Sequence, residues 1–170
     1  MPTILHLVKT LSLRPTLPEV PGVRLRPFAG PLDIEVWLDL RRRSFAGQPV
    51  GARAWTRAEF EAEFLAKPWW SPQRLWFAQS RTTTLAEPVG TAALAQRGNL
   101  PVVHWLCVLP EWRRRGVGSL LLAALEVRCW DEGQRVLGLE THIRWQAALD
   151  LYRASGYLPA GGVEQPTTAE

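Results

Sequence analysis

The sequence contains few of the residues on which several classes of protein depend. Among its 170 residues there are two cysteines, one methionine and three histidines. Cys107 and Cys129 lie in separate apolar segments, and His6, His104 and His142 are far apart, so neither a disulfide framework nor a metal site is indicated. We therefore expect two buried free thiols, no bound metal and a cytoplasmic location.

Long apolar runs and lysine are also scarce. No stretch reaches the ~18 apolar residues that a membrane-spanning helix needs, and residues 1–9 lack the features of a signal peptide. Of the twenty basic residues only Lys9 and Lys67 are lysines. A net charge of +4 favours anionic ligands but is too small to indicate nucleic-acid binding. We expect neither a membrane nor a nucleic acid as partner.

The composition indicates one folded domain with flanking segments. Hydrophobic residues make up 46% of the chain, which is enough for a single core. Three prolines between Pro15 and Pro21 disfavour helix and sheet. We therefore expect an N-terminal arm or linker over residues 1–22, the domain over 23–160 and a polar C-terminal tail over 161–170.

Hydrophobic spacing predicts an α/β fold. Strands are expected over residues 23–28, 75–78, 89–94, 102–108 and 136–141. Helices are expected over residues 33–45, from a capping box at Thr56 and Glu59 onwards, and over 118–130 and 145–154. Because strand and helix alternate in the second half, parallel pairing is expected there.

The segment 106–118 carries most of the functional information. An apolar run ends at Pro110, a basic loop with two glycines follows, and then an apolar helix begins. Such a loop presents free backbone N–H groups and the positive end of a helix dipole to an anion, most often a phosphate. Ser119 stands where a Walker loop needs lysine, and Leu121 where a dinucleotide motif needs its third glycine. What remains is a short pyrophosphate cradle, in which Gly116 and Gly118 allow close approach of the backbone.

This segment resembles the cofactor motif of the GCN5-related N-acetyltransferases (GNAT). That motif, Arg/Gln-x-x-Gly-x-Gly/Ala, follows a strand reading Leu-x-Val-x-Pro, and residues 106–118 match both parts at their proper spacing. Residues 148–157 resemble the closing Ala-x-x-Leu-Tyr-x-x-x-Gly-Phe/Tyr segment, and residues 139–141 take the place of Leu-Glu-Val. The resemblance extends from about Val102 to Tyr157 and is only topological over 23–100.

The resemblance implies a single GNAT-type α/β domain whose mixed central sheet is flanked by helices and splayed at the cofactor strand. It implies transfer of an acetyl group from acetyl-CoA, as co-substrate, to a primary amine by direct attack. The acceptor is a protein N-terminus or peptide, or a small-molecule amine, with Glu140 slightly favouring the first. The alternative is a non-catalytic acyl-CoA-binding module of the same fold, acting in regulation or interaction. Either form is a monomer or a homodimer.

The resemblance also implies which residues hold the cofactor. Loop amides bind the pyrophosphate, the strand pairs with the pantetheine arm, and one strand amide polarises the thioester carbonyl. The expected cofactor-binding residues are Leu106, Cys107, Val108, Arg113, Arg114, Arg115, Gly116, Val117, Gly118, Ser119 and Trp145. Trp145 replaces an asparagine that usually binds pantetheine, and indole has a donor but no acceptor. Gln146 is a substitute for that contact.

Three residues are candidates for proton transfer. Tyr152 matches the family's general acid for the leaving thiolate, and its alternative role is packing in the core. Because an amine is mostly protonated at neutral pH, a base or a water path must accept its proton. Glu140 matches the base of ribosomal-protein N-terminal-alanine acetyltransferases, and His104 matches a proton-relaying histidine of serotonin N-acetyltransferases. Ordered water is the third alternative, and both side chains also have purely structural alternatives.

Three further features have expected places. Trp37, Trp76, Trp105 and Trp130 are expected in the core. Trp55, Trp69 and Trp70 flank the second helix, where the resemblance puts the acceptor, and packing is favoured over pocket lining. Residues 41–43 are arginines at the end of the first helix, where their charges offset the helix dipole. In the less favoured alternative they bind an acidic acceptor. After Tyr157 the family's last strand is short, missing or supplied by another segment or subunit.

Overall fold

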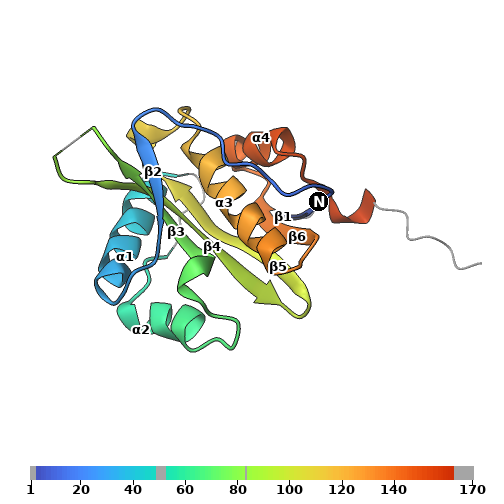
Figure 1. Cartoon of the computed structure of the whole chain (residues 1–170), viewed down its shortest axis with the longest axis horizontal. Helices are drawn as coiled ribbons and strands as arrows, with labels where there is room; N and C mark the ends of the chain where they lie inside the picture. Colours follow the sequence, from blue (N-terminus) through green and yellow to red (C-terminus); the bar gives the residue numbers. More distant parts are fainter. Residues whose placement is uncertain (1–2, 49–52, 83, 163–170) are drawn as a thin grey trace, which may run out of the picture.

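A mixed sheet with helices on both faces forms the protein in the computed structural model, which describes residues 3–48, 53–82 and 84–162 (Figure 1). The strands are β1 (Ile4–Thr10), β2 (Val23–Pro27), β3 (Leu75–Ser80), β4 (Pro88–Arg97), β5 (Leu100–Val108), β6 (Val136–His142) and β7 (Leu158–Pro159). The longer helices are α1 (Leu32–Phe45), α3 (Val117–Asp131) and α4 (Gln146–Ala154). The short helix α2 (Arg57–Phe60) continues into a π-helical turn, Glu61–Leu65.

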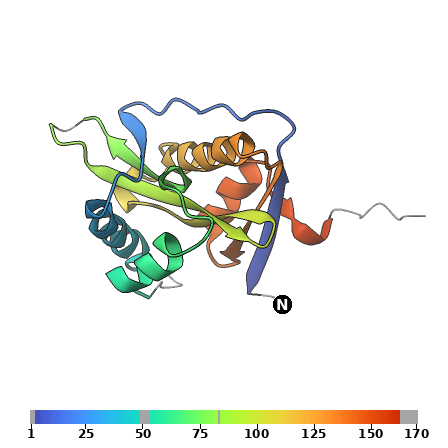
Figure 2. The same ribbon diagram turned by 60° about the horizontal axis from the view of Figure 1, so that its bottom comes forward.

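The seven strands lie in the order β2-β3-β4-β5-β6-β1-β7. Strands β5 and β6 pair in parallel, and the other neighbouring pairs are antiparallel. Helix α3 covers one face of the sheet, and α1 and α2 cover part of the other (Figure 2). The α/β class with a mixed central sheet is thus as predicted from the sequence.

Local signals in the sequence fix the start of α2. The hydroxyl of Thr56 accepts a hydrogen bond from the Glu59 N–H, and the Glu59 carboxylate accepts one from the Thr56 N–H. This is the predicted capping box, which satisfies two helix-end donors. Phe60 and Phe64 then lie on one face with their ring centroids 4.8 Å apart, and both are buried under the sheet.

The N-terminal segment corrects the sequence-based expectation of an arm over residues 1–22. Ile4–Thr10 form strand β1, which pairs with β6 along its length, and β7 is only two residues long on the outer side of β1. Of the alternatives for the last strand, a short strand is observed after Tyr157, and another segment, β1, lies between it and β6. The side chain of Lys9 reaches Glu126 on α3 at 2.9 Å, and the Tyr157 hydroxyl donates to the same carboxylate.

The irregular part of that segment is limited to residues 11–22. It crosses the outer side of α3 and leads from β1 to β2 at the far side of the sheet (Figure 2). Val20 of this crossing segment lies close to Gly116, at the start of α3. The crossing segment therefore packs near the cradle that the sequence predicts.

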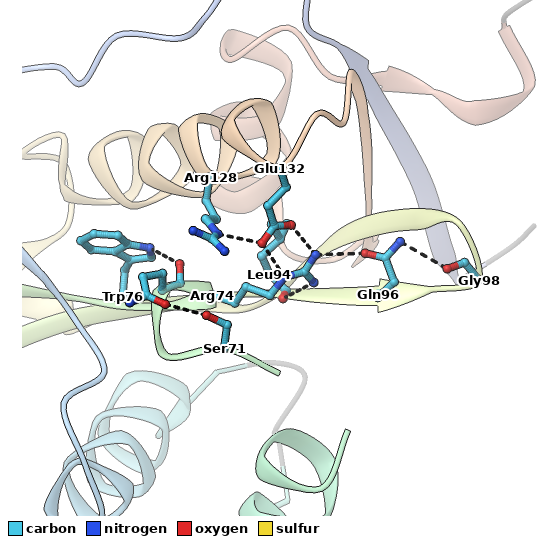
Figure 3. A network of polar contacts seen from close by, with 9 residues as sticks. Ser71, Arg74, Trp76, Leu94, Gln96, Gly98, Arg128 and Glu132 are labelled. Atoms are coloured by element: carbon cyan, nitrogen blue, oxygen red, sulfur yellow. Dashed lines mark hydrogen bonds and ion pairs between the residues drawn. The ribbon is translucent and has the colours of Figure 1, made fainter. Parts of the chain in front are cut away.

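A polar network fastens the C-terminal end of α3 to the sheet (Figure 3). The Arg74 guanidinium donates to the Glu132 carboxylate, to the Leu94 carbonyl and to the Gln96 side chain. Arg128, one turn earlier on α3, donates to the same carboxylate at 2.7 Å. Charge-assisted hydrogen bonds of this kind are stronger than neutral ones. They hold one end of α3, while the other end faces the candidate site.

Candidate active site

Strands β5 and β6 separate shortly after they meet. Their parallel ladder consists of Val102 opposite Gly138 and Val103 opposite Leu139. Beyond these pairs β5 runs on to Val108 and β6 to His142, each outside the ladder. A cavity of about 880 Å³ lies at this separation, lined by both strands, the end of α1, the start of α3 and much of α4. The sheet is therefore splayed at the strand that the sequence assigns to the cofactor.

A β-bulge shapes the cavity wall on β5. Ala93 of β4 pairs with His104 and Thr91 pairs with Cys107, so Trp105 and Leu106 both lie opposite one residue of β4. Trp105 has a φ of 51°, in the left-handed region that residues with a β-carbon seldom occupy. A bulge bends its strand and redirects the backbone groups beside it. The strand thus departs from regular pairing where the expected thioester contact lies.

The start of α3 forms a second wall of the cavity. Arg114 and Gly116 have φ values of 62° and 84°, and the first bond back into the loop runs from the Leu120 N–H to the Gly116 carbonyl. The N–H groups of residues 117–119 precede that bond, and the first N–H groups of a helix have no carbonyl partner within it. These donors and the positive helix end face the same loop, so the geometry suits an anion.

The two glycines of the loop serve different purposes. Gly116 is needed for its positive φ, which a β-carbon disfavours. Gly118 lies close to α4, since a β-carbon there would lie 3.0 Å from a Leu151 methyl group, which would have to move. The first shapes the cradle, and the second allows α4 to pack against α3.

The three arginines of the loop also differ from one another. Arg113 donates to the carbonyls of Val108 and Ser44, at 3.1 and 2.6 Å, and so ties the end of β5 to α1. Arg114 lines the cavity. The guanidinium of Arg115 lies 4.8 Å from the ring centre of Trp112, and Arg115 is not among the lining residues. All the other residues expected to bind the cofactor do line the cavity.

Several buried polar atoms in the cavity wall have no hydrogen-bond partner among the described residues. They include the indole nitrogens of Trp105 and Trp145 and the hydroxyl of Thr141. A buried polar group without a partner costs about 1–3 kcal/mol, so a polar ligand that reaches it is favoured. Thr141 is 3% exposed and was not expected in the site, because a threonine at a strand end carries no distinguishing signal.

An aromatic pair closes one side of the cavity. The rings of Phe45, at the end of α1, and Trp145, just before α4, are stacked with centroids 5.4 Å apart. Both residues line the cavity. Where the family usually has an asparagine, this chain therefore has an aromatic ring that packs against the end of α1.

Tyr152 projects from α4 into the cavity wall. It is 6% exposed, and burial raises the pKa of its hydroxyl above the ordinary value. Its ring meets that of Tyr157 edge to face, with centroids 5.9 Å apart. The hydroxyl therefore keeps its proton at neutral pH, as a proton donor requires.

Glu140 and His104 line the same cavity from β6 and β5. Glu140 forms an ion pair with Arg97 and lies 3.3 Å from the ring nitrogen Nδ1 of His6. The hydrogen bond from Arg97 is the main cause of a lowered pKa for the Glu140 carboxyl. Burial, together with the charge of Arg97, lowers the pKa of His104 to about 4. At neutral pH the carboxylate is therefore charged and the imidazole is neutral.

The remaining sequence-based expectations have mixed outcomes. Cys107 and Cys129 are free and buried. Of the four tryptophans expected in the core, Trp37 is fully buried, whereas Trp76, Trp105 and Trp130 are half-buried against the core. Trp55, Trp69 and Trp70 are half-buried against Phe64 and are not among the cavity-lining residues.

Within the described residues there is no group of acidic, histidine and cysteine side chains placed to hold a metal. None of the described helices has the length and apolar character needed to cross a membrane.

Comparison with known proteins gives one consistent assignment. The sequence profile of the Acetyltransferase (GNAT) family matches residues 35–157. A mycothiol acetyltransferase from Thermobispora bispora is 31% identical over 146 residues, which cover 84% of this chain and 48% of that protein. The fold is similar to that of a GCN5-related N-acetyltransferase from Sphaerobacter thermophilus, with a TM-score of 0.75 at 23% identity, covering 92% of this chain and 48% of that one.

A second solved structure adds a ligand-bound example of the fold. It is the NatC complex bound to Gag peptide and CoA, with a TM-score of 0.63 at 16% identity, covering 81% of this chain and 85% of that one. The curated relatives are longer proteins, and this chain spans about half of their length.

Proposed function

Because the chain belongs to the acetyltransferase (GNAT) family, we propose that it transfers an acetyl group from acetyl-CoA to a primary amine by direct attack. One observation supports this most strongly. The cavity joins a helix-start anion cradle at residues 113–119 to the separated edges of β5 and β6. Such a site suits a ligand with a phosphate group at one end and an amide-bearing arm at the other.

The residues present fit coenzyme A. The N–H groups of residues 114–119 hold the pyrophosphate, and the free edge of β5 at residues 106–108 pairs with the pantetheine amides. The hydroxyl of Thr141 and the indole N–H of Trp145 supply polar contacts that the usual asparagine makes elsewhere in the family. At about 880 Å³ the cavity is also near the upper end of typical ligand sites.

Proton transfer in the proposed reaction is divided between two sides of the cavity. Tyr152, whose hydroxyl stays protonated, gives its proton to the departing thiolate. On the other side Glu140 is already engaged by Arg97, so its charge attracts the acceptor ammonium while its basicity is low. His104 is neutral at assay pH, but its lowered pKa of about 4 makes it a weak base as well, so it relays the proton of the amine to water and does not keep it. A backbone amide at the bulge polarises the acetyl carbonyl.

The proposed acceptor is either a small-molecule amine or the free N-terminus of a peptide. Relatives of this chain are named mycothiol acetyltransferase, which makes amines related to mycothiol part of any screen. Peptides with free N-termini form the other part. Acetylation of one class and not the other identifies the acceptor.

Two measurements test the proposal in sequence. Calorimetric titration with acetyl-CoA, CoA and ATP tests the cofactor, and we expect both coenzyme A species to bind more tightly than ATP. Release of free CoA in the presence of the amine panel then tests catalysis. Binding of acetyl-CoA without turnover on any amine supports the non-catalytic binding module, which the replacement at Trp145 favours. Absence of coenzyme A binding contradicts both functions.

A further inference from the structure

An arginine is buried among aromatic rings behind the bulge of β5. Arg41 on α1 is 3% exposed, and its guanidinium carbon lies 4.3 Å from the ring centre of Trp105 and 5.1 Å from that of Trp55. Among the described residues its hydrogen-bond partner is the carbonyl of Arg53. The neighbouring Arg42 and Arg43 bind Asp39 at the surface, as expected for the end of a helix. Arg41 therefore differs from the dipole-compensating cations that the sequence predicts.

Trp105, whose ring lies against this guanidinium, has an unfavourable backbone conformation. Trp105 occupies the left-handed region at a φ of 51°, which glycine adopts freely and a tryptophan adopts only when its surroundings hold it there. Three groups surround its ring: Arg41, the ring of Trp55 at 5.3 Å and the ring of His104 at 4.7 Å. The conformation of the bulge thus depends on contacts made by the side chain.

The position of Trp105 connects this packing to the cavity. Trp105 and Leu106 are the two residues of the bulge, and both line the cavity wall together with His104. A cation held over the face of an indole, away from water, makes one of the stronger contacts of this type. No carboxylate within the described residues forms an ion pair with Arg41, and burying an unpaired charge is costly, which argues against Arg41 serving only to fill space.

We propose that Arg41 is a positioning residue: stacked on the indole of Trp105, it keeps the β5 bulge in the left-handed conformation that acetyl transfer requires. The expected effect on kcat rests on the proposed function, whereas the conformation of the bulge can be measured whether or not the protein transfers acetyl groups. Arg41 has no place in the cavity lining, so it acts through Trp105 and touches no substrate.

Four variants test this arrangement. Arg41→Met removes the charge and keeps an apolar chain of similar length, and Arg41→Lys keeps the charge. Trp105→Gly allows the left-handed backbone without any contact to a ring, and the double variant Arg41→Met/Trp105→Gly combines the changes. The matched control is Arg135→Met, because Arg135 stacks on Trp130 at 3.6 Å, outside the cavity lining.

Two readouts are needed for each variant. Hydrogen exchange of the amides of residues 105–107, followed by NMR, reports the bulge in the absence of turnover. Steady-state kinetics with acetyl-CoA report kcat separately from KM. For Arg41→Met we expect about tenfold faster exchange at these amides and about tenfold lower kcat, with KM changed by less than about twofold.

The decisive comparison is between the double variant and Trp105→Gly. If Arg41 acts by holding the left-handed backbone, the two have the same kcat, since glycine needs no such support. Arg41→Lys recovers part of the loss, and Arg135→Met behaves as the unaltered protein.

Two results overturn the inference. One is unchanged exchange and kcat in Arg41→Met, and the other is a double variant that falls below Trp105→Gly by the full factor seen for Arg41→Met. If Arg41→Met does not fold, Arg41→Lys with its exchange pattern decides the same question. If the unaltered protein transfers no acetyl group, the proposed function fails, while exchange at residues 105–107 still tests the role of Arg41.

Discussion

Substitution of Gly116 by alanine distinguishes an effect on coenzyme A binding at the anion cradle from an effect on the stability of the fold. Gly116 has a φ of 84°, and a β-carbon there would lie 3.4 Å from a methyl group of Val20, which is an ordinary contact. The cost of the change is therefore conformational, about 1–2 kcal/mol for an L-residue in the left-handed region. For a domain of this size each kcal/mol lowers Tm by roughly 2–4 °C.

The same helix offers a matched control. Gly133 follows the C-terminal end of α3 with a φ of 82°, and a β-carbon there would meet nothing within 4 Å. Gly133→Ala therefore carries the same conformational cost at the end of α3 that is remote from the cavity. Both variants should lose similar stability in denaturant or thermal unfolding.

Only the variant at the cradle should lose affinity for coenzyme A. If the backbone at Gly116 leaves the left-handed region, at least one N–H donor to the pyrophosphate is misaligned. A hydrogen bond to a charged group contributes about 1.5–3 kcal/mol, so the Kd for CoA should rise by about 10- to 100-fold in Gly116→Ala. Calorimetric titration of both variants measures this ratio. Equal CoA affinity in Gly116→Ala and Gly133→Ala refutes the assignment of the cradle.

Further predictions concern the proton-transfer groups and the network of Figure 3. Tyr152→Phe should lower kcat about tenfold to a hundredfold with little change in CoA affinity, and equal kcat removes it as the acid. Because burial lowers the pKa of His104 to about 4, the pH–rate profile should show no loss of rate near pH 6.5. His104→Gln should lower kcat across the pH range. Glu140→Gln should mainly raise KM for the amine. Burial alone would raise the pKa of Glu132, but the hydrogen bonds from Arg74 and Arg128 outweigh this effect, so the pKa of Glu132 is lowered. Since the unfolded carboxylate binds protons at higher pH than the folded one, Tm should fall as pH drops below about 4.5, and less so in Glu132→Gln.

Elements with local signals could be predicted from the sequence. The capping box at Thr56 depends on residues within one helical turn, and the start of α3 depends on Gly116 and the loop before it. Likewise, the strand at residues 102–108 and the cradle after it are adjacent in the chain. These helices and strands need no knowledge of tertiary packing, so their predicted bounds lie within a few residues of the observed ones, while the role of the cradle stays a prediction.

Features that depend on distant partners could not be predicted. Ile4–Thr10 become a strand because they pair with β6, whose sequence lies at the other end of the chain. Arg41 is buried because Trp55 and Trp105 converge on it from distant parts of the chain, whereas Arg42 and Arg43, which follow it, are more exposed. The left-handed backbone at Trp105 opposes its intrinsic preference, so propensity predicts a regular strand there.

A crystal structure of the full chain with acetyl-CoA tests the central claim most directly. The account predicts the pyrophosphate within hydrogen-bonding distance of the N–H groups of residues 114–119. It also predicts the pantetheine arm between β5 and β6, with the acetyl group beside the bulge at Trp105 and Leu106. Acetyl-CoA bound elsewhere, with the separation between β5 and β6 left empty, would contradict it.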